Sequence, residues 1–251
     1  MSEPSDFNVS PEANANKNSA AKKPDPTEFQ LPEFLKVSDI VKSDSLDWDY
    51  FYRQGTPSWD TGKPEPCFFE MLKKHKIQPC TVLEIGCGSG ADACVISALK
   101  FEVTAIDIAS MAIDRARLMA EKYHQEMRIV HGDVFSFSER CGTFDLVYDI
   151  GFYHYIRDHQ IRKFLDLLWR TTHSGSYYYT LCAAAENALP PFEFEKTPHD
   201  PLPKVAPPPV YEDEIRMELG RLFETIDIQP AFMQSRENID YPAWSCLFRR
   251  P

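Results

Sequence analysis

The segment that most constrains the fold is a short apolar run that leads directly into three closely spaced glycines. Residues 82 to 90 read Val-Leu-Glu-Ile-Gly-Cys-Gly-Ser-Gly, and Ala91 to Leu99 then follow a helical pattern. Glycines let the backbone turn tightly and approach a ligand closely, and the amide end of the next helix attracts a polar group. A glycine loop can also be a simple tight turn, so the elements around it are needed to decide whether it binds a ligand.

Apolar runs typical of strands and helices alternate after this loop. The elements expected in order are a strand at Phe101 to Ile106, a helix at Ala109 to Tyr123, a strand at Met127 to Val130, a strand at Phe144 to Tyr148, a helix from about Asp158 to Thr171 and a strand at Tyr177 to Cys182. Strands and helices that alternate at this spacing indicate βαβ units and a parallel sheet. The sequence therefore predicts an α/β, Rossmann-like, doubly wound fold.

The pattern changes after Cys182. Residues 190 to 209 form a proline-dense loop, a helix is expected at Glu212 to Leu222, and strands are expected at Phe223 to Ile228 and at Trp244 to Arg249. Two terminal strands suit a hairpin that carries the last, antiparallel strand. We therefore expect a mostly parallel sheet of seven strands.

The first 32 residues differ from the rest in composition. They are rich in Pro, Asn, Ser, Ala, Lys and Glu and contain few aliphatic residues, so they cannot bury enough surface to offset the entropy of ordering. We predict a disordered head at residues 1–32 and one folded domain at 33–251. Within that domain we expect a front segment at 33–66, a ligand-binding core at 67–182, and a loop with the terminal hairpin at 183–251.

Charge and cysteine content narrow the classes of partner. The formal net charge of −11 makes the chain repel phosphate backbones and anionic lipid. No apolar run approaches the roughly 18 to 20 residues of a membrane span, and the start lacks the features of a signal peptide. The seven cysteines fit reduced thiols, and Cys80, Cys87 and Cys94 match no usual zinc spacing. We expect a cytoplasmic monomer with no metal site that binds neither nucleic acid nor membrane.

Carboxylates follow the next two strands. Asp107 ends the strand after the glycine loop, where it can accept hydrogen bonds from both hydroxyls of a ribose. The loop lacks the full G-x-G-x-x-G pattern and has no basic clamp for a pyrophosphate, which favours S-adenosylmethionine over a dinucleotide. Asp133 follows the third strand and can receive the adenine amino group, with Val134 packed on the ring.

These segments together resemble a known family. E-I-G-C-G-S-G, A-I-D-I, G-D-V-F and F-D-L-V-Y-D look like the successive motifs of class I S-adenosylmethionine-dependent methyltransferases, in the right order between about Thr81 and Cys182. The resemblance implies S-adenosylmethionine as the cofactor. The residues that it implies in cofactor binding are Trp48, Tyr52, Trp59, Glu84, Gly86, Cys87, Gly88, Gly90, Asp107, Ile108, Asp133, Val134 and Asp149.

The segment before the core resembles one group within that family. Trp59, Asp60, Gly62 and Pro66 match a W-D-x-G-x-x-x-P stretch of the thiopurine and plant-type halide/thiol methyltransferases, and an aromatic pair precedes it. Residues four apart share one face of a helix, so Trp48 and Tyr52 would form an aromatic wall suited to a sulfonium cation. We interpret the segment as a lid over the cofactor, while simple packing of an amphipathic helix on the core is the alternative.

The end of the fourth strand supplies the catalytic candidates. In parallel α/β folds this edge of the sheet binds ligands, so Asp149, Tyr153 and His154 are expected near the methyl acceptor. Asp149 would position the reactants, and Tyr153 and His154 would line the acceptor site, although His154 can also be a purely structural residue. Ile150 stands where the resembling group commonly has Arg, so any anchor supplied by that Arg is missing.

The sequence thus predicts methyl transfer from S-adenosylmethionine to a small-molecule acceptor, namely a thiol or another soft nucleophile such as a halide. The first alternative keeps the cofactor but takes a metabolite amine or oxygen, a metalloid or a protein lysine as acceptor. The second alternative is a cofactor-binding protein without transfer activity. The intact glycine loop and Asp107 count against that second alternative, because a protein that had lost cofactor binding would need neither.

Overall fold

The structure is a computed structural model that describes residues 47–185, 208–236, 238 and 240–251. All described residues belong to one compact unit, Lys42–Pro251. The expected head at 1–32, the start of the front segment and most of the proline-dense loop lie outside the described residues. The predicted domain boundaries therefore remain predictions.

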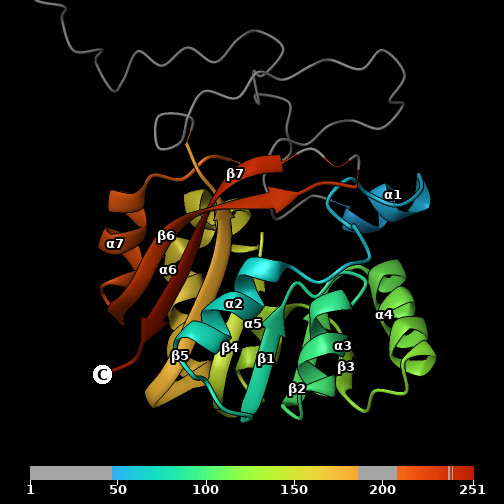
Figure 1. The fold of residues 1–251 in the computed structure, drawn as a ribbon, viewed down its shortest axis with the longest axis horizontal. Coiled ribbons are helices and arrows are strands. Elements are labelled where there is room, and N and C mark those ends of the chain that lie inside the picture. The colour runs from blue at the N-terminus through green and yellow to red at the C-terminus, as the bar shows by residue number, and fades with distance from the viewer. Residues whose placement is uncertain (1–46, 186–207, 237, 239) are drawn as a thin grey trace, which may run out of the picture. The chain divides into compact units, whose positions relative to one another are not determined.

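Seven strands form one mixed sheet with the order β3-β2-β1-β4-β5-β7-β6 (Figure 1). The strands are β1 (Thr81–Ile85), β2 (Glu102–Asp107), β3 (Arg128–His131), β4 (Phe144–Ile150), β5 (Thr172–Ala183), β6 (Glu224–Gln234) and β7 (Asp240–Arg249). Strands β1 to β5 pair in parallel, whereas β7 lies antiparallel between β5 and β6. The predicted α/β, doubly wound sheet with an antiparallel last strand is confirmed.

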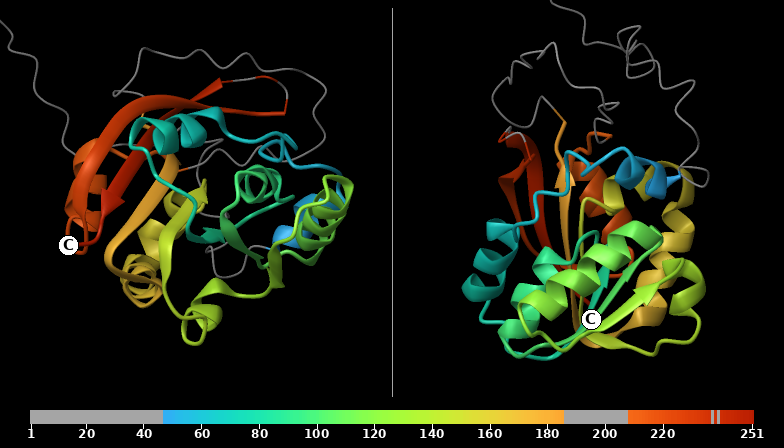
Figure 2. Two further views of the ribbon diagram at one scale, coloured as in Figure 1. Left: turned by 60° about the horizontal axis from the view of Figure 1, so that its bottom comes forward. Right: turned by 90° about the vertical axis from the view of Figure 1, so that its right-hand side faces the viewer.

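Helices cover both faces of the sheet. The helices are α1 (Trp48–Arg53), α2 (Pro66–Lys74), α3 (Ala91–Ala98), α4 (Ser110–Lys122), α5 (Val134–Ser138), α6 (Tyr153–Thr171) and α7 (Glu212–Leu219). The core on one face contains side chains of α2, α3 and α4, and the core on the other face contains side chains of α5, α6 and α7. The right-hand view of Figure 2 shows α2 and α6 on opposite sides of the strands. Among the described residues, no helix is long and apolar enough to cross a membrane.

The alternation of side chains along the central strands builds these two cores. Successive residues of a strand point to opposite faces, so Val147 packs on the side of α6 while Tyr148 packs on the side of α2. The ring of Tyr148 stacks on Phe68 at a centroid distance of 4.2 Å. Both faces of β4 are therefore apolar, as expected for a central parallel strand.

The helix after β4 begins five residues earlier than the pattern predicts. It starts at Tyr153 rather than near Asp158, and Gln160 has non-helical backbone angles, with φ −133° and ψ 21°. The carboxylate of Asp149 accepts the N–H groups of Phe152 and Tyr153 at 3.0 and 2.9 Å and so supports the first turn. The apolar periodicity predicted only the part of α6 that follows the irregular residue.

Strand β6 is longer than expected and extends beyond Ile228 to Gln234. It pairs with β7 from Glu224 opposite Arg249 to Gln234 opposite Asp240. Pro230 lies within it, which an edge strand tolerates because one side of its backbone has no partner strand. The extension brings the end of β6 to the carboxyl edge of the parallel strands, where the site lies.

Candidate active site

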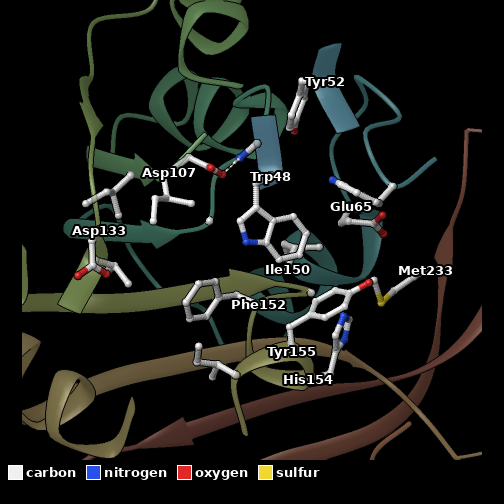
Figure 3. Close-up of a pocket in the computed structure, with 18 of the residues that line it drawn as sticks. Trp48, Tyr52, Glu65, Asp107, Asp133, Ile150, Phe152, His154, Tyr155 and Met233 are labelled. Carbon is white, nitrogen blue, oxygen red and sulfur yellow. Dashed lines mark hydrogen bonds between the residues drawn. The ribbon is translucent and has the colours of Figure 1, made fainter. Parts of the chain in front are cut away.

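A pocket of about 600 Å³ lies at the carboxyl ends of β1, β2, β3 and β4 (Figure 3). This edge of a doubly wound sheet is where such folds bind ligands. The ends of these strands, the loops that follow them and the start of α5 contribute Gly86, Gly88, Ile106, Asp107, Ile108, Gly132, Asp133, Val134, Phe135, Ile150, Gly151 and Phe152. The front segment, α6 and the terminal hairpin contribute Trp48, Tyr52, Ser58, Trp59, Glu65, His154, Tyr155, Ile156, Gln160, Lys163, Met233, Gln234, Ser235 and Tyr241.

The glycine loop forms the floor of the pocket. Gly86 and Gly88 have φ angles of +69° and +52°, which residues with a side chain rarely adopt. A Cβ on Gly86 would lie 3.1 Å from Phe152, and one on Gly88 would lie 3.3 Å from the hydroxyl of Tyr52. The N–H groups of Gly86 and Cys87 both donate to the carbonyl of Ile106, at 2.9 and 3.0 Å. The loop is therefore fixed at the end of β2, and the missing side chains leave room for a ligand close to the backbone.

Asp107 lies beside this loop, as the sequence predicts. Its carboxylate accepts the N–H of Gly88 at 2.9 Å and the N–H of Ala109 at 2.8 Å, one on each oxygen. Burial raises the pKa of Asp107 above its usual value. Because a carboxylate oxygen has two lone pairs, each oxygen keeps acceptor capacity on the pocket wall. These are the acceptors that a pair of ribose hydroxyls requires.

Asp133 marks one end of the pocket, with Val134 and Phe135 beside it. Its side chain caps α5 by accepting the N–H groups of Phe135 and Ser136 at 3.1 and 3.3 Å. The hydroxyl of Ser136 donates to the same carboxylate at 3.0 Å. Asp133 is thus oriented by the first turn of α5, while Val134 presents an apolar surface to the pocket.

Three residues expected in cofactor binding lie behind the pocket wall. Glu84 is 3% exposed on β1, and burial raises its pKa well above the usual value. Cys87 is buried in the core on the side of α2, and burial likewise raises the pKa of its thiol. Gly90 caps α3 in the left-handed conformation, where a Cβ would lie 2.9 Å from that of Ala116. None of these residues is among the pocket-lining residues.

Asp149 is the last residue but one of β4, is fully buried and does not line the pocket. Besides two backbone N–H groups at the start of α6, it accepts the hydroxyl of Tyr178 at 2.6 Å and that of Thr180 at 3.2 Å. Burial raises its pKa to about 6, while these hydrogen bonds act in the opposite direction. The carboxylate therefore joins β4, β5 and the start of α6.

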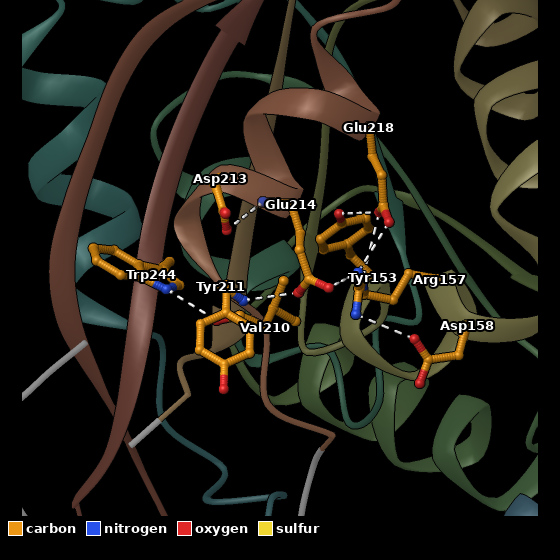
Figure 4. A network of polar contacts seen from close by, with 9 residues as sticks. All are labelled: Tyr153, Arg157, Asp158, Val210, Tyr211, Asp213, Glu214, Glu218 and Trp244. Carbon is orange, nitrogen blue, oxygen red and sulfur yellow. Dashed lines mark hydrogen bonds and ion pairs between the residues drawn. The ribbon is translucent and has the colours of Figure 1, made fainter. Parts of the chain in front are cut away.

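Tyr153 also points away from the pocket. Its hydroxyl donates to Glu218 on α7 at 2.5 Å, and Arg157 forms ion pairs with Glu218 at 2.9 Å and with Glu214 at 3.1 Å (Figure 4). Glu214 in turn accepts the N–H of Tyr211 at 3.0 Å. This network fastens α7 to α6. Of the three catalytic candidates, Asp149 and Tyr153 therefore lie off the pocket, and His154 lines it.

His154 lines the pocket although only 1% of its surface is exposed. Its Nδ1 accepts the N–H of Ala183 at 3.1 Å, and its ring lies 4.6 Å from that of Tyr155. Burial lowers the pKa of His154 to about 3. The imidazole is therefore neutral at physiological pH, and the hydrogen bond fixes its orientation.

Aromatic rings from the front segment cover the pocket. Trp48 lies 5.8 Å from Trp59 and 5.4 Å from Tyr155, in edge-to-face geometry. Tyr52 is 4% exposed and packs with Ala109 and Ala112 next to the glycine loop. The aromatic pair expected at helical spacing is therefore on the pocket wall, and Trp59 joins it there.

Hydrogen bonds hold this front segment on the core. Asp49 accepts the hydroxyl of Ser110 at 3.0 Å and the N–H of Met111 at 2.9 Å, at the start of α4. Asp60 accepts the hydroxyl of Ser89 at 2.5 Å and lies 3.5 Å from Arg115. Asp60 of the W-D-x-G stretch is thus an anchor to the glycine loop.

Several residues on the wall were not singled out by sequence reasoning. Glu65 belongs to the W-D-x-G-x-x-x-P stretch, and Phe152 and Tyr155 follow β4 in a segment rich in aromatic residues. The motif and the aromatic-rich segment could therefore have indicated these three residues. Met233 and Tyr241 carried none, because only the pairing of β6 with β7 brings them to the site.

Comparison with known proteins agrees with this geometry. Residues 82–175 match a family described as a methyltransferase domain. The 2-heptyl-1-hydroxyquinolin-4(1H)-one methyltransferase of Mycobacteroides abscessus is 24% identical over 176 residues, which are 70% of this chain and 72% of the relative.

Two solved structures share the fold. A structure described for the conversion of a disulfide bond into a thioacetal group during echinomycin biosynthesis covers 80% of this chain and 89% of its own, with 24% identity and a TM-score of 0.66. Magnesium protoporphyrin IX methyltransferase from Synechocystis PCC 6803, solved with S-adenosylmethionine bound, covers 72% of this chain and 75% of its own, with 15% identity and a TM-score of 0.52.

The sheet order, the glycine loop and the family match define a methyltransferase with the class I fold. The chain is an S-adenosylmethionine-dependent enzyme of this class. The predictions of the class, of the enzyme and of the cofactor are confirmed. The narrower likeness to thiopurine and halide/thiol methyltransferases stays a prediction.

Proposed function

We propose that this enzyme transfers the methyl group to a small-molecule soft nucleophile, with a thiol as the first choice. The observation that carries the proposal is the continuous pocket, which extends from the glycine loop along the largely apolar side chains of Ile150, Phe152, Tyr155 and Met233. When bound, S-adenosylmethionine supplies a methyl group on a sulfonium that is already activated for in-line displacement. Alignment and exclusion of water then account for much of the catalysis. A thiol suits such a site, because its pKa of about 8.5 lets it ionise easily near neutral pH.

The chain's residues divide into a cofactor end and an acceptor end. Asp107 binds the ribose, Asp133 and Val134 bind the adenine, and the backbone of Gly86 and Gly88 borders the rest of the cofactor. The rings of Trp48 and Trp59 cover the sulfonium, where a cation over an aromatic face is stabilised by about 0.5 to 2 kcal/mol. Tyr155 and His154 border the acceptor.

A second candidate is an oxygen or nitrogen of a heteroaromatic acceptor. The aromatic rings at the acceptor end favour a flat molecule, since ring pairs add about 0.5 to 1.5 kcal/mol beyond area burial. The relative from Mycobacteroides abscessus is named for a hydroxyquinolinone acceptor. Such an acceptor presents both a flat ring system and an ionisable hydroxyl group.

The test is formation of S-adenosylhomocysteine with a panel of acceptors. The panel contains an aliphatic thiol, an aromatic thiol, hydrosulfide, iodide, 2-heptyl-1-hydroxyquinolin-4(1H)-one and a lysine peptide. Methylation of a thiol or of iodide supports the first candidate. Methylation of the quinolinone alone supports the second, and methylation of the lysine peptide alone rejects both.

A further inference from the structure

Two titratable side chains lie at the end of the pocket away from Asp107 and Asp133. Figure 3 shows Glu65 and His154 at this end, together with Tyr155 and Met233. Among the described residues, no hydrogen-bond or ion-pair partner reaches the carboxylate of Glu65 or Nε2 of His154. Both groups can therefore form hydrogen bonds with a bound acceptor.

The hydrogen bonding of His154 decides what this side chain can offer. Nδ1 accepts the N–H of Ala183, so in the neutral ring the hydrogen is on Nε2. Taking up a second proton is unfavourable because the ring is buried. His154 is consequently a hydrogen-bond donor toward the pocket and cannot serve as the base.

Glu65, in contrast to His154, can act as a base. Its backbone N–H donates to Asp92 on α3 at 2.8 Å, and α2 begins at the next residue, so the backbone position is fixed. Burial, followed by the negative charge of Asp92, raises the pKa of Glu65 to about 7. A second cavity beside Glu65 is lined by Glu70 and Asp240 and by no cationic side chain. At neutral pH the ionised form of this carboxyl can therefore take up a proton from an acceptor, and the protonated form is also populated.

We propose that Glu65 is the proton acceptor of the methyl-transfer reaction and that the acceptor carries a weakly acidic X–H group, where X is sulfur or oxygen. The bond from X to the methyl carbon forms while the bond from that carbon to the cofactor sulfur breaks, with its electron pair left on sulfur. The proton of X–H moves to the carboxylate of Glu65. His154 donates its Nε2 hydrogen to a polar atom of the acceptor. This inference rests on the proposed function of the same pocket.

The test compares two thiols that differ in their need for a base. 4-Nitrothiophenol is already ionised at neutral pH, whereas benzyl mercaptan is not. Glu65→Gln keeps the shape of the side chain but cannot take up the proton. We expect its kcat for benzyl mercaptan to fall by about 100-fold or more, and its kcat for 4-nitrothiophenol to change by less than about 5-fold. The matched control, Glu70→Gln, alters an exposed glutamate on α2 and should behave as the wild type.

A second readout does not depend on turnover. The infrared carboxyl bands of the wild type minus those of Glu65→Gln, recorded with S-adenosylhomocysteine bound, report the ionisation of this one side chain between pH 5 and 9. We expect a transition near pH 7, because burial raises the pKa of Glu65 to about 7. A carboxylate that stays ionised over this whole range would overturn the inference, whether or not the right acceptor has been found.

Other outcomes separate the possible failures. An equal loss with both thiols contradicts a role in proton transfer. A raised Kd for S-adenosylmethionine with unchanged kcat assigns Glu65 to cofactor binding instead, and also overturns the inference. If the wild type methylates neither thiol but does methylate the hydroxyquinolinone, the thiol proposal fails, and the effect of Glu65→Gln on that acceptor decides the role of Glu65.

Discussion

Two acidic residues near the carboxyl ends of β2 and β4 differ in their surroundings: Asp107 is the last residue of β2, whereas Asp149 lies level with Ile106, one residue deeper in the sheet and on its opposite face. Asp107 accepts two N–H groups from its own loop and still lines the pocket. Asp149 accepts two N–H groups and two hydroxyls, and it is fully buried. Asp149 faces the side of α6, where β5 brings Tyr178 and Thr180 to it. One residue of difference in strand position therefore decides whether a carboxylate meets a ligand or the core.

The largest effect is expected for Asp149→Ala. This change leaves four buried donors without their acceptor, so the free energy of unfolding should fall by about 3 to 5 kcal/mol. Urea unfolding measures the change. Asp114→Ala, at an exposed site on α4, should stay within about 0.5 kcal/mol of the wild type. If Asp149→Ala is as stable as the wild type yet inactive, the contrast with Asp107 is wrong and Asp149 acts on a ligand.

His154 gives a pH-dependent effect at the acceptor end. The buried imidazole stays neutral in the folded protein, whereas in the unfolded chain it takes up a proton below about pH 6.5. The stability of the wild type relative to His154→Gln should therefore decrease as the pH falls from 6.5 to 4.5, by up to about 1.4 kcal/mol per pH unit. Urea unfolding of both proteins at several pH values measures this difference. A constant difference would show that His154 is protonated in the folded state.

Asp107→Ala tests the cofactor end. Loss of charge-assisted hydrogen bonds should weaken S-adenosylmethionine binding by about 1 to 3 kcal/mol, measured by calorimetry. Because Asp107 also holds Gly88 and Ala109, its replacement can disturb the loop. Asp107→Asn keeps the shape and one acceptor oxygen, so it should weaken binding less. Unchanged affinity for S-adenosylmethionine in both variants would contradict the assignment of Asp107 to the ribose.

The smallest effect is expected for Tyr153→Phe. The change removes the hydrogen bond to Glu218, while Arg157 remains paired with that residue. We expect a loss of about 1 kcal/mol in the free energy of unfolding and unchanged kcat with the best acceptor of the panel. A strong loss of kcat without a loss of stability would instead indicate that Tyr153 takes part in catalysis.

The cofactor end could be predicted from the sequence because its parts lie close together in the chain. Gly86, Gly88 and Asp107 fall within about one βαβ unit, so the strand and helix patterns alone place them at one edge of the sheet. Asp133 follows from the next unit by the same reasoning. The presence of seven strands with an antiparallel last strand was also predicted from the sequence, whereas their order in the sheet comes from the structure.

The acceptor end could be predicted only in part, because it is assembled from distant segments. His154 and the aromatic residues of the front segment were expected at the pocket, and they line it. The burial of Asp149 depends on Tyr178, 29 residues away, and the orientation of Tyr153 depends on Glu218, 65 residues away. Met233 reaches the pocket through a strand whose length the apolar pattern did not reveal.

The described part of the front segment before α2 is held on the rest of the molecule by polar contacts and by the packing of Trp48 and Tyr52, and not by strand pairing. Asp49 and Asp60 attach it to α4 and to the glycine loop, and the N–H of Arg236 donates to the carbonyl of Ser58 at 2.8 Å. Its aromatic residues nevertheless form a wall of the pocket. For protein engineering, this makes the aromatic cover of the cofactor a separable part: exchanging the stretch from Trp48 to Asp60 between two such enzymes should change the affinity for the cofactor while the sheet keeps its fold.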